Sequence, residues 1–366
     1  MVSLPQHKKY VIIGAGMHGL STAWHLAKEL KARGKGSGED IVVLDKTAPG
    51  AGASGIACGV IRNFYFQPAM GEVMRVSVDV WEQNAEALHY HDVGYIAVVG
   101  PAQDSDLQAI YERQQKSGYR SELIQGEQQV FDHMRRLFPD WRARGLTTCL
   151  HERQGGFAVN IASVMGLVAK VEAEGVSILS GVEVTGFDVQ GGVVTAVQTS
   201  QGTIQTEQVV VGVGPWVKTI WTMLGLPNTI DIRKPDGSVV KDWDMWTYWR
   251  LQEGEITVNP AEYVTADGAY PPVIHIDSSE PLISDITGKL ITDELWGIYF
   301  KRDRHGVQGG AVPENLGTSV QVDPYGLSSP YYTVKEDFVD YWTAGLAHCM
   351  ERFVGCGAAY HRAPSG

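Results

Sequence analysis

Residues 9–45 decide the fold, and they read KYVIIGAGMHGLSTAWHLAKELKARGKGSGEDIVVLD. The apolar run at 10–13 predicts a short strand, and apolar residues at helical spacing from Leu20 to Leu30 predict a helix. A second apolar strand over 41–44 ends in Asp45. Three glycines occupy the turn between the first strand and the helix: Gly14, Gly16 and Gly19. This order of strand, glycine turn, helix, strand and acid is typical of a dinucleotide-binding site.

Each part of this pattern has a chemical reason. Gly14 allows a tight turn, Gly16 lets the backbone approach a pyrophosphate, and Gly19 lets the helix pack closely on the strand. The amides at the helix start attract phosphate charge, and Asp45 accepts hydrogen bonds from a ribose hydroxyl. A purely structural turn is the alternative, but the flanking elements favour the cofactor site. The predicted cofactor contacts of this stretch are Gly14, Gly16, Met17, His18, Gly19, Asp45 and Lys46.

The composition is that of an ordinary globular chain, long enough for two domains. It has 366 residues, of which 44% are apolar and 20% are charged. The net charge of −12 argues against nucleic acid or an anionic membrane as the main partner. No apolar run is long enough to span a bilayer, and no signal peptide precedes the first strand, so we expect a cytoplasmic protein. Four cysteines without metal-ligand spacing predict reduced thiols and no metal site.

Residues 46–68 form a stretch rich in glycine and alanine, KTAPGAGASGIACGVIRNFYFQP. Small residues suit a loop that lies against a flat ligand, and we predict that Ser54 and Gly55 contact phosphate or ring. Arg62 is the first charge after Lys46, in a strongly acidic chain. A guanidinium can hold a carboxylate with two parallel hydrogen bonds, so Arg62 is a candidate for substrate binding. A structural ion pair is the alternative.

The rest of the chain predicts a second part of the dinucleotide domain and then a second layer. Residues 161–174 have the pattern of a helix, and 176–216 that of a β-meander with a glycine-rich exit. Residues 120–150 show no regular pattern and predict an irregular segment. Strands rich in Trp, Tyr, Val and Ile over 233–332 predict an antiparallel layer. A capping box at 333–336 predicts a last helix, with no closing strand after it.

Five motifs resemble those of the D-amino-acid oxidase and sarcosine oxidase family of FAD-dependent amine oxidoreductases. They follow the family's order over residues 9–220: YVIIGAGMHGLSTAWHLA, VVLDK, GASGIACGVIRNFY, GGFAVN and VVVGVGPW. The resemblance implies an α/β fold with an FAD-binding Rossmann-like domain of the glutathione-reductase type and a second, antiparallel-sheet substrate domain. The implied divisions are 1–90 with 150–225 for FAD, 91–149 with 226–334 for the substrate, and 335–366 for a helix returning to the FAD domain.

The resemblance implies FAD as the cofactor, with its ADP half at the first glycine turn. Ser54 and Gly55 are implied to lie along the pyrophosphate and flavin. Val184 resembles the position whose backbone meets the adenine. Gly214 with Trp216 resembles the family's second glycine turn.

The resemblance also implies the catalytic residues. Arg62 falls where members of the family often hold the substrate carboxylate. Residues 296–310, WGIYFKRDRHGVQGG, resemble the substrate-domain strand in front of the flavin, and on a strand Tyr299 and Lys301 share one face. In sarcosine-oxidase-like members a lysine near this point assists reaction of the reduced flavin with oxygen, so Lys301 is the candidate and Tyr299 aligns equally well. A surface position is the competing interpretation for Lys301, and we expect His275 to be a satisfied core histidine.

The implied function is oxidation of the C–N bond of a small amino acid or N-methyl amino acid, by hydride transfer to the flavin N5. The expected partners are a small carboxylate-bearing amine and either oxygen or an electron-acceptor protein. Two features depart from the family: its C-terminal segment is not found, and Gly59 stands where relatives often have a basic residue. Two alternatives stay open, a non-catalytic or partner-dependent FAD-binding subunit and a nicotinamide-dependent dehydrogenase.

Overall fold

The computed structural model describes residues 4–257, 262–304, 306–311, 314–317 and 336–361. The chain forms two compact units, each with its own sheet and core. The first unit comprises Met1–Ala57, Asn160–Trp249 and Asn315–Gly326. The second comprises Cys58–Val159, Arg250–Glu314 and Leu327–Gly366. The roles of the two units, FAD binding and substrate binding, stay predictions at this point.

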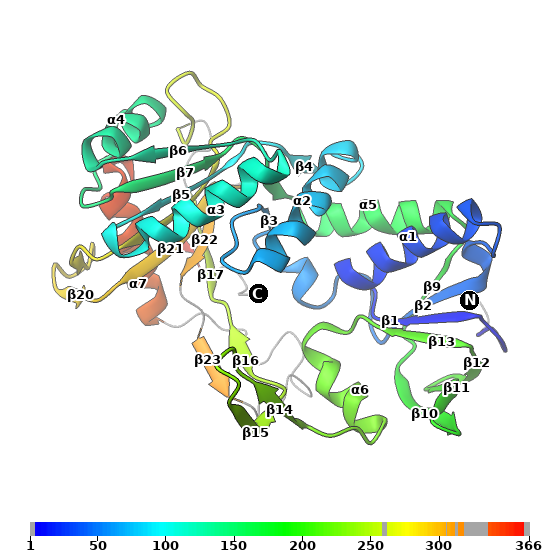
Figure 1. Ribbon diagram of the computed structural model, residues 1–366. Helices are drawn as coiled ribbons and strands as arrows, with labels where there is room; N and C mark the ends of the chain where they lie inside the picture. The colour runs from blue at the N-terminus through cyan, green and yellow to red at the C-terminus, as the bar shows by residue number, and fades with distance from the viewer. Residues whose placement is uncertain (1–3, 258–261, 305, 312–313, 318–335, 362–366) are drawn as a thin grey trace. The chain divides into compact units, whose positions relative to one another are not determined.

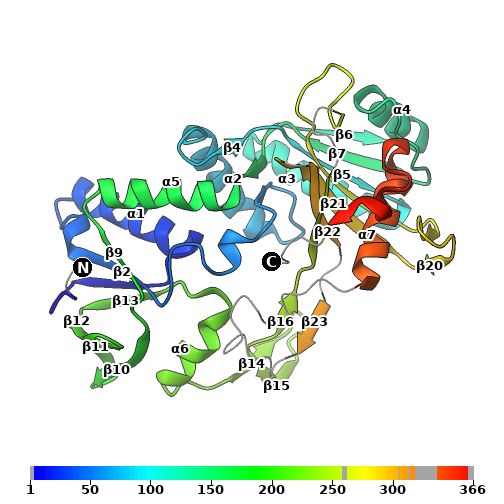
Figure 2. The same cartoon turned by 180° about the vertical axis from the view of Figure 1, so that it is seen from behind.

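The first unit is built on a parallel four-stranded sheet in the order β13-β1-β2-β9. Helices α1 and α5 lie side by side (Figures 1 and 2). The apolar positions that the sequence pattern assigns to α1 are buried in the structure, together with Gly19. The bounds are β1 Tyr10–Ile13, β2 Ile41–Asp45, β9 Ser177–Ser180, β13 Gln208–Val211, α1 Met17–Ala32 and α5 Asn160–Ala173.

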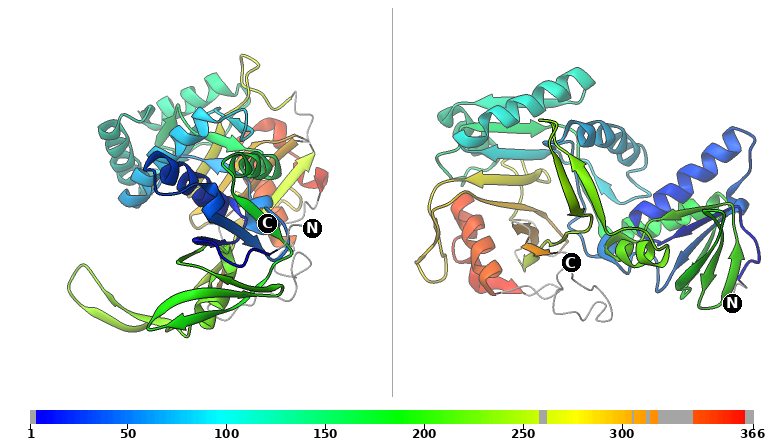
Figure 3. Two further views of the ribbon diagram at one scale, coloured as in Figure 1. Left: turned by 90° about the vertical axis from the view of Figure 1, so that its right-hand side faces the viewer. Right: turned by 60° about the horizontal axis from the view of Figure 1, so that its bottom comes forward.

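An antiparallel meander of three strands, β10 to β12, belongs to the same unit, as the sequence predicts. After the short helix α6 the chain forms a hairpin of β14 and β15, whose two strands run together as one ribbon in Figure 3. The bounds are β10 Val184–Gln190, β11 Val193–Thr199, β12 Gly202–Gln205, α6 Val217–Met223, β14 Thr229–Arg233 and β15 Val239–Asp244.

The second unit is built on an eight-stranded sheet in the order β24-β17-β22-β21-β18-β5-β7-β6. The sequence predicts an antiparallel layer, and the structure differs at one place, because β18 runs parallel to β5. The bounds are β5 Tyr95–Val99, β6 Ser121–Gln125, β7 Thr148–Glu152, β17 Glu253–Thr257, β18 Val273–Ser278, β21 Trp296–Arg302, β22 Gly306–Ala311 and β24 Tyr360–His361.

Smaller elements complete the two units, and β16 and β23 lie where the chain passes from one unit to the other. In a three-stranded sheet of order β3-β8-β4, the strand β8, which follows β7 in the chain, pairs with β3 and β4, which precede β5. Two further strand pairs are β16 with β23 and β19 with β20. The bounds are β3 Val60–Ile61, β4 Tyr90–His91, β8 Gly156–Ala158, β16 Tyr248–Arg250, β19 Leu282–Ile283, β20 Leu290–Thr292, β23 Glu314–Gly317, α2 Pro68–Gln83, α3 Asp104–Ser117 and α4 Glu127–Leu137.

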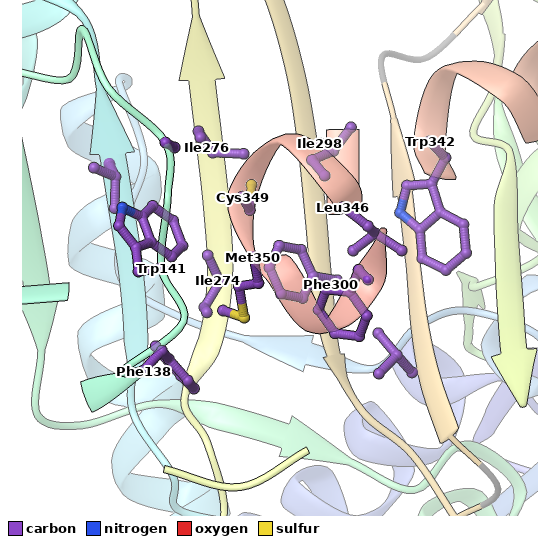
Figure 4. Close-up of a cluster of buried hydrophobic side chains, with 14 of the residues drawn as sticks. Phe138, Trp141, Ile274, Ile276, Ile298, Phe300, Trp342, Leu346, Cys349 and Met350 are labelled. Carbon is purple, nitrogen blue, oxygen red and sulfur yellow. The ribbon is translucent and has the colours of Figure 1, made fainter. Parts of the chain in front are cut away.

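The two faces of the eight-stranded sheet differ, because side chains alternate along each strand. One face is apolar and packs against helix α7 (Glu336–Cys349), as Figure 4 shows for Ile276, Ile298 and Leu346. The other face is apolar over β5 and β7, where it packs against α3, and polar over β17 and β21. There His275 on β18 lies beside Tyr299 on β21, and both Tyr299 and Glu253 are register partners of Gly310. One face of the sheet is therefore largely apolar, and polar side chains gather on one part of the other face, where Glu253 is 5% exposed.

Three sequence expectations need correction. The last helix packs in the second unit, not in the unit of the glycine turn, because its apolar residues join the core of the eight-stranded sheet. A closing strand does follow it, the two-residue β24, which pairs with β17. Residues 120–150 are not irregular, because they hold β6, α4 and β7. The start of the predicted capping box, 333–335, lies outside the described residues.

Candidate functional site

The first part of the candidate site is the glycine turn between β1 and α1. Gly14 has a φ of +101°, in the region that favours glycine. A Cβ on Gly14 would meet the carbonyl oxygen of Gly212, and a Cβ on Gly19 would meet the carbonyl oxygen of Gly14. Gly212 directly follows β13, so two neighbouring strands end in backbone that approaches too closely for any side chain.

Side chains complete this turn at the start of α1. The Met17 amide donates to the Ser54 hydroxyl at 3.0 Å, and the Ala15 amide donates to Asp45 Oδ2 at 2.9 Å. Asp45 Oδ1 accepts the Thr47 amide at 2.9 Å. A carboxylate oxygen can accept two hydrogen bonds, so Oδ2 retains room for a ribose hydroxyl. The structure thus brings Asp45 and Ser54 to the glycine turn.

A tryptophan and a lysine lie together near the second glycine-rich turn. The Lys46 ammonium lies 4.5 Å from the ring centroid of Trp216. The same ring lies against Gly52, where a Cβ would come within 3.1 Å of it. The indole nitrogen of Trp216 is buried and finds no hydrogen-bond acceptor within the described ranges. A buried hydrogen-bond donor without a protein acceptor suits a site where a bound ligand supplies that acceptor.

The remaining predicted cofactor positions also lie in the first unit. Val184 is buried at the start of β10, and the Val182 amide donates to the Asp45 carbonyl at 2.9 Å, so this segment runs beside the end of β2. His18 is exposed, whereas Gly55 packs against the backbone of its own loop. These residues fit the ADP half of FAD, because backbone amides, an acid and an unpartnered indole surround one turn.

Arg62 belongs to the second unit and follows β3. Its guanidinium carbon lies 4.9 Å from the ring centroid of Tyr65 and 5.4 Å from that of Tyr95. Its Nε donates to the Phe64 carbonyl at 3.3 Å. Burial disfavours the charge, yet the nearby Tyr95, Tyr65 and Glu152 raise the pKa of Arg62 above its ordinary value. In the part of the chain that the structure describes, no carboxylate forms an ion pair with Arg62, so the structural ion pair has no support.

Tyr299 lies on the polar face of the sheet and donates to Glu253 Oε1 at 2.7 Å. Glu253 is 5% exposed, and its other oxygen has no hydrogen-bond partner among the described residues. Burial raises the pKa of Glu253, against the hydrogen bond from Tyr299. A Cβ on Gly310 would lie 2.6 Å from the Tyr299 hydroxyl, so glycine is required there for the ring to occupy this place.

Lys301 is buried, so its interpretation as a surface lysine is wrong. It is 1% exposed, and its ammonium lies 2.9 Å from Asp303 Oδ1 and 4.6 Å from the ring centroid of Phe157. The Cys58 thiol is also buried, and burial and the negative charge of Glu253 raise its pKa well above the ordinary value. Lys301 is therefore a cation held inside the unit, and Cys58 stays a protonated thiol.

His275 lies between Tyr95 and the acid Asp277. Its Nε2 lies 3.1 Å from Asp277 Oδ1, and its ring centroid is 6.4 Å from that of Tyr95. Burial opposes ionisation of Asp277, but His275 and a hydrogen bond from Gln103 hold the pKa of Asp277 below its usual value. His275 thus lies close to an acid, but its Nε2 has no hydrogen-bond partner among the described residues, so the expectation of a satisfied core histidine stays a prediction.

Several residues of this region have no signal in the sequence motifs. Glu152 ends the missed strand β7, is 0% exposed, and accepts the Asn63 amide at 2.9 Å. Glu253 belongs to a segment without a family motif, and Gly310 ends the segment that resembles a family strand but was not singled out there. The signal that points to them is a charged or glycine residue inside an otherwise apolar strand pattern, and it becomes informative only once the strand order is known.

A parallel sheet with a glycine turn, a terminal acid and a following meander defines a dinucleotide-binding α/β protein. The sequence match is more specific. Residues 9–267 match the family described as FAD dependent oxidoreductase (DAO), and the chain belongs to this family. The predicted family, fold class and cofactor FAD are thereby confirmed.

Relatives and solved structures agree with this assignment. The chain is 27% identical over 202 residues to the sarcosine oxidase subunit beta of Rhizobium meliloti (strain 1021), covering 54% of this chain and 47% of that protein. It is 23% identical over 295 residues to 4-methylaminobutanoate oxidase (formaldehyde-forming) of Paenarthrobacter nicotinovorans, covering 75% and 34%. The fold is similar to that of L-proline dehydrogenase from P. horikoshii, with a TM-score of 0.72, 19% identity, and coverage of 98% and 80%. The chain thus spans about half or less of these two curated relatives.

Proposed function

We propose that this chain is an FAD-dependent oxidoreductase that oxidises the C–N bond of a small amino acid or N-methyl amino acid. The observation that carries this proposal is Arg62, a half-buried cation close to two tyrosine rings, with which no carboxylate of the described residues forms an ion pair. Names of relatives support the substrate class, since they include a sarcosine oxidase subunit and a 4-methylaminobutanoate oxidase. In this proposal the first unit binds FAD and the second binds the substrate.

Arg62 would hold the substrate carboxylate through two parallel hydrogen bonds. Fixing one end of a small substrate in this way lowers the barrier by several kcal/mol, because the reacting carbon no longer searches for its orientation. FAD, when bound, supplies the hydride acceptor. At the first unit, the Gly14 turn, Asp45 and Trp216 would hold its ADP half.

Tyr299 and Lys301 would act on the polar face of the sheet. The Tyr299 hydroxyl already donates to Glu253, so its free lone pair can accept a hydrogen bond from a substrate N–H. Lys301 would supply positive charge that favours the reaction with oxygen, and Asp303 fixes its position. Oxygen or an acceptor protein completes the reaction, and we propose a cytoplasmic location. No helix among the described residues has the length and apolar character needed to cross a membrane.

The test is the visible absorption spectrum of the purified, FAD-loaded chain before and after anaerobic addition of N-methyl and D-amino acids. Bleaching of the flavin band by one of them is the expected result and names the substrate class. The variant Arg62→Ala should retain FAD but show a large rise in KM. Arg142→Ala is the matched control, because Arg142 makes an exposed ion pair with Glu351 at 2.9 Å. An unchanged KM in Arg62→Ala would remove Arg62 from the site.

A second candidate is a partner-dependent FAD-binding subunit. It has one specific support, since the relative from Rhizobium meliloti is named as a subunit. In that case the isolated chain would bind FAD without bleaching by any amine. Turnover by the isolated chain would exclude this candidate.

A further inference from the structure

Glu152 is a buried acid directly behind the candidate carboxylate-binding arginine. It ends β7, is 0% exposed, and lies opposite Tyr95 in the register of β5 and β7. Its Oε2 accepts the Asn63 amide at 2.9 Å and the Tyr119 hydroxyl at 3.2 Å. Its Oε1 accepts Gln114 Nε2 at 2.5 Å. Because Asn63 directly follows Arg62 in the chain, Glu152 fixes the backbone that presents the guanidinium.

All three donors to Glu152 are neutral groups. No lysine, arginine or histidine of the described ranges forms an ion pair with this carboxylate, although the charge of Arg62 acts on it from a greater distance. A buried carboxylate without a paired cation is costly in its charged form. Burial accordingly raises the pKa of Glu152 to about 7, against the hydrogen bonds and Arg62, which lower it.

The tyrosines around Glu152 do not carry charge near neutral pH. Tyr95 on β5, Tyr90 on β4 and Tyr119 after α3 all have a pKa raised above the ordinary value, chiefly by burial. Beyond Tyr90 and Tyr119 lies the carboxylate of Glu82 on α2, which accepts Gln154 Nε2 at 3.1 Å. The only cation that acts on Glu152 in this set is therefore Arg62.

The neutral form of Glu152 also has a place for its proton. Gln114 is 1% exposed, and its amide oxygen is buried without a hydrogen-bond partner among the described residues. A rotation of this amide by half a turn would exchange its donor for its acceptor. A protonated Glu152 would then donate to Gln114 Oε1, the amide oxygen that has no partner in the present arrangement.

We propose that Glu152 is a positioning residue that shares Arg62 with the substrate carboxylate and takes up one proton when that carboxylate binds. The proposal rests on the proposed role of Arg62. A substrate carboxylate bound to the Arg62 guanidinium reduces the attraction between Arg62 and ionised Glu152. Glu152 therefore takes up a proton from solvent, which forms an Oε–H bond. No other bond changes.

This coupling gives carboxylate binding a pH dependence with a definite sign. Below about pH 7 Glu152 is already protonated, so the carboxylate binds without cost. Above that value each bound carboxylate must bring in a proton, and affinity falls by up to about tenfold per pH unit.

The experiment is calorimetric titration of the FAD-loaded protein with propionate at pH 8, in two buffers of different ionisation enthalpy. We expect uptake approaching one proton per propionate bound, and a new carboxylic-acid C=O band in the infrared difference spectrum of the unmodified protein. Glu152→Gln should abolish the uptake and strengthen propionate binding by about tenfold at this pH. Glu82→Gln is the matched control and should behave as the unmodified protein.

The possible failures can be told apart. Propionate binding without proton uptake or an acid band in the unmodified protein would overturn the role of Glu152 and leave that of Arg62 intact. Propionate binding that is as tight in Arg62→Ala, or no better than that of propionamide, would overturn the proposed function itself. The infrared measurement needs no variant, so misfolding of Glu152→Gln does not prevent a decision.

Discussion

The glycine turn of the first unit is formed mainly by backbone atoms, whereas the polar part of the sheet face in the second unit is formed by ionisable side chains. At the turn, backbone atoms approach one another so closely that Gly14 and Gly19 leave no space for a Cβ. On the sheet face, ionisable side chains from separate segments act on one another, as Arg62 does on Glu152 and Lys301 on Glu253. The first region is therefore sensitive to added volume, and the second to changes in charge.

Under the proposed function, this difference would divide two tasks between the two regions. A cofactor that is always the same can be recognised by fixed backbone geometry. A small charged substrate that must enter, react and leave is better held by side chains whose charge and hydrogen bonds can change. The following predictions test this division, beginning with the largest expected effect.

The variant Gly19→Ala should break the first region. Its Cβ would collide with the carbonyl oxygen of Gly14, a backbone atom that cannot move without opening the turn. We expect a loss of more than about 3 kcal/mol in the free energy of unfolding and purification without FAD. Gly71→Ala is the control, because its nearest neighbour would be 3.9 Å away and alanine favours the helix α2. Full FAD content in Gly19→Ala would contradict the close packing described for the turn.

Acid should weaken the second unit through His151. The His151 Nδ1 lies 3.1 Å from His133 Nε2, and the His151 Nε2 lies 3.2 Å from Arg153 Nη1. Burial lowers the pKa of His151 to about 3. The unfolded chain takes up the proton near pH 6.5 and the folded chain does not, so stability present above pH 6.5 is lost as the pH falls. Between pH 6.5 and 5 the loss is about 2 kcal/mol. The free energy of unfolding of His151→Gln, measured in urea, should lack this part of the pH dependence. If it falls as steeply with decreasing pH as that of the unmodified protein, the prediction is contradicted.

The variant Lys301→Met should slow reoxidation of the reduced flavin by oxygen while leaving its reduction by substrate nearly unchanged. The substitution keeps the volume of the side chain but removes the charge beside Asp303. We expect a roughly tenfold slower reoxidation in stopped-flow absorbance. Lys241→Met serves as the control, because Lys241 pairs with Asp231 on an exposed hairpin. If both half-reactions match those of the unmodified protein, Lys301 has only a structural role.

The smallest effect is expected for Ser54→Ala. This variant removes the hydroxyl that accepts the Met17 amide at 3.0 Å and leaves the backbone packing of the turn intact. The expected loss is about 1 kcal/mol in the free energy of unfolding or in the free energy of FAD binding. Equilibrium dialysis measures the FAD binding. Ser238→Ala in the exposed β14–β15 turn is the control. A loss as large as that of Gly19→Ala would mean that side chains, and not backbone, dominate this region.

The first region could be predicted from the sequence because all its signals are local. Gly14, Gly16, Gly19 and Asp45 lie within one strand-helix-strand unit, where spacing alone fixes the geometry. The helical positions of α1 follow from apolar periodicity for the same reason. Arg62 was found because it is a single charge in a neutral segment.

The second region could be predicted only in part, because its residues meet through strand order. The strand β7 has the sequence TCLHE, and its polar residues are buried by pairing with β5 and β6. Local propensity therefore gave no sign of a strand at residues 148–152, and Glu152 was missed with it. Burial of Lys301 likewise depends on Phe157, far away in the chain.

The parallel pairing of β18 with β5 has a consequence for how the protein acquires its fold. These central neighbours are separated by residues 100–272, a stretch that includes β9 and β13, two of the four strands of the other unit's parallel sheet. The pair can close only after that stretch has been synthesised, so the contact order of the second unit is high. Until then β5 has an unpaired edge that can join another chain. Folding of the second unit should thus be slow, concentration-sensitive, and faster when the first unit is already formed around its cofactor.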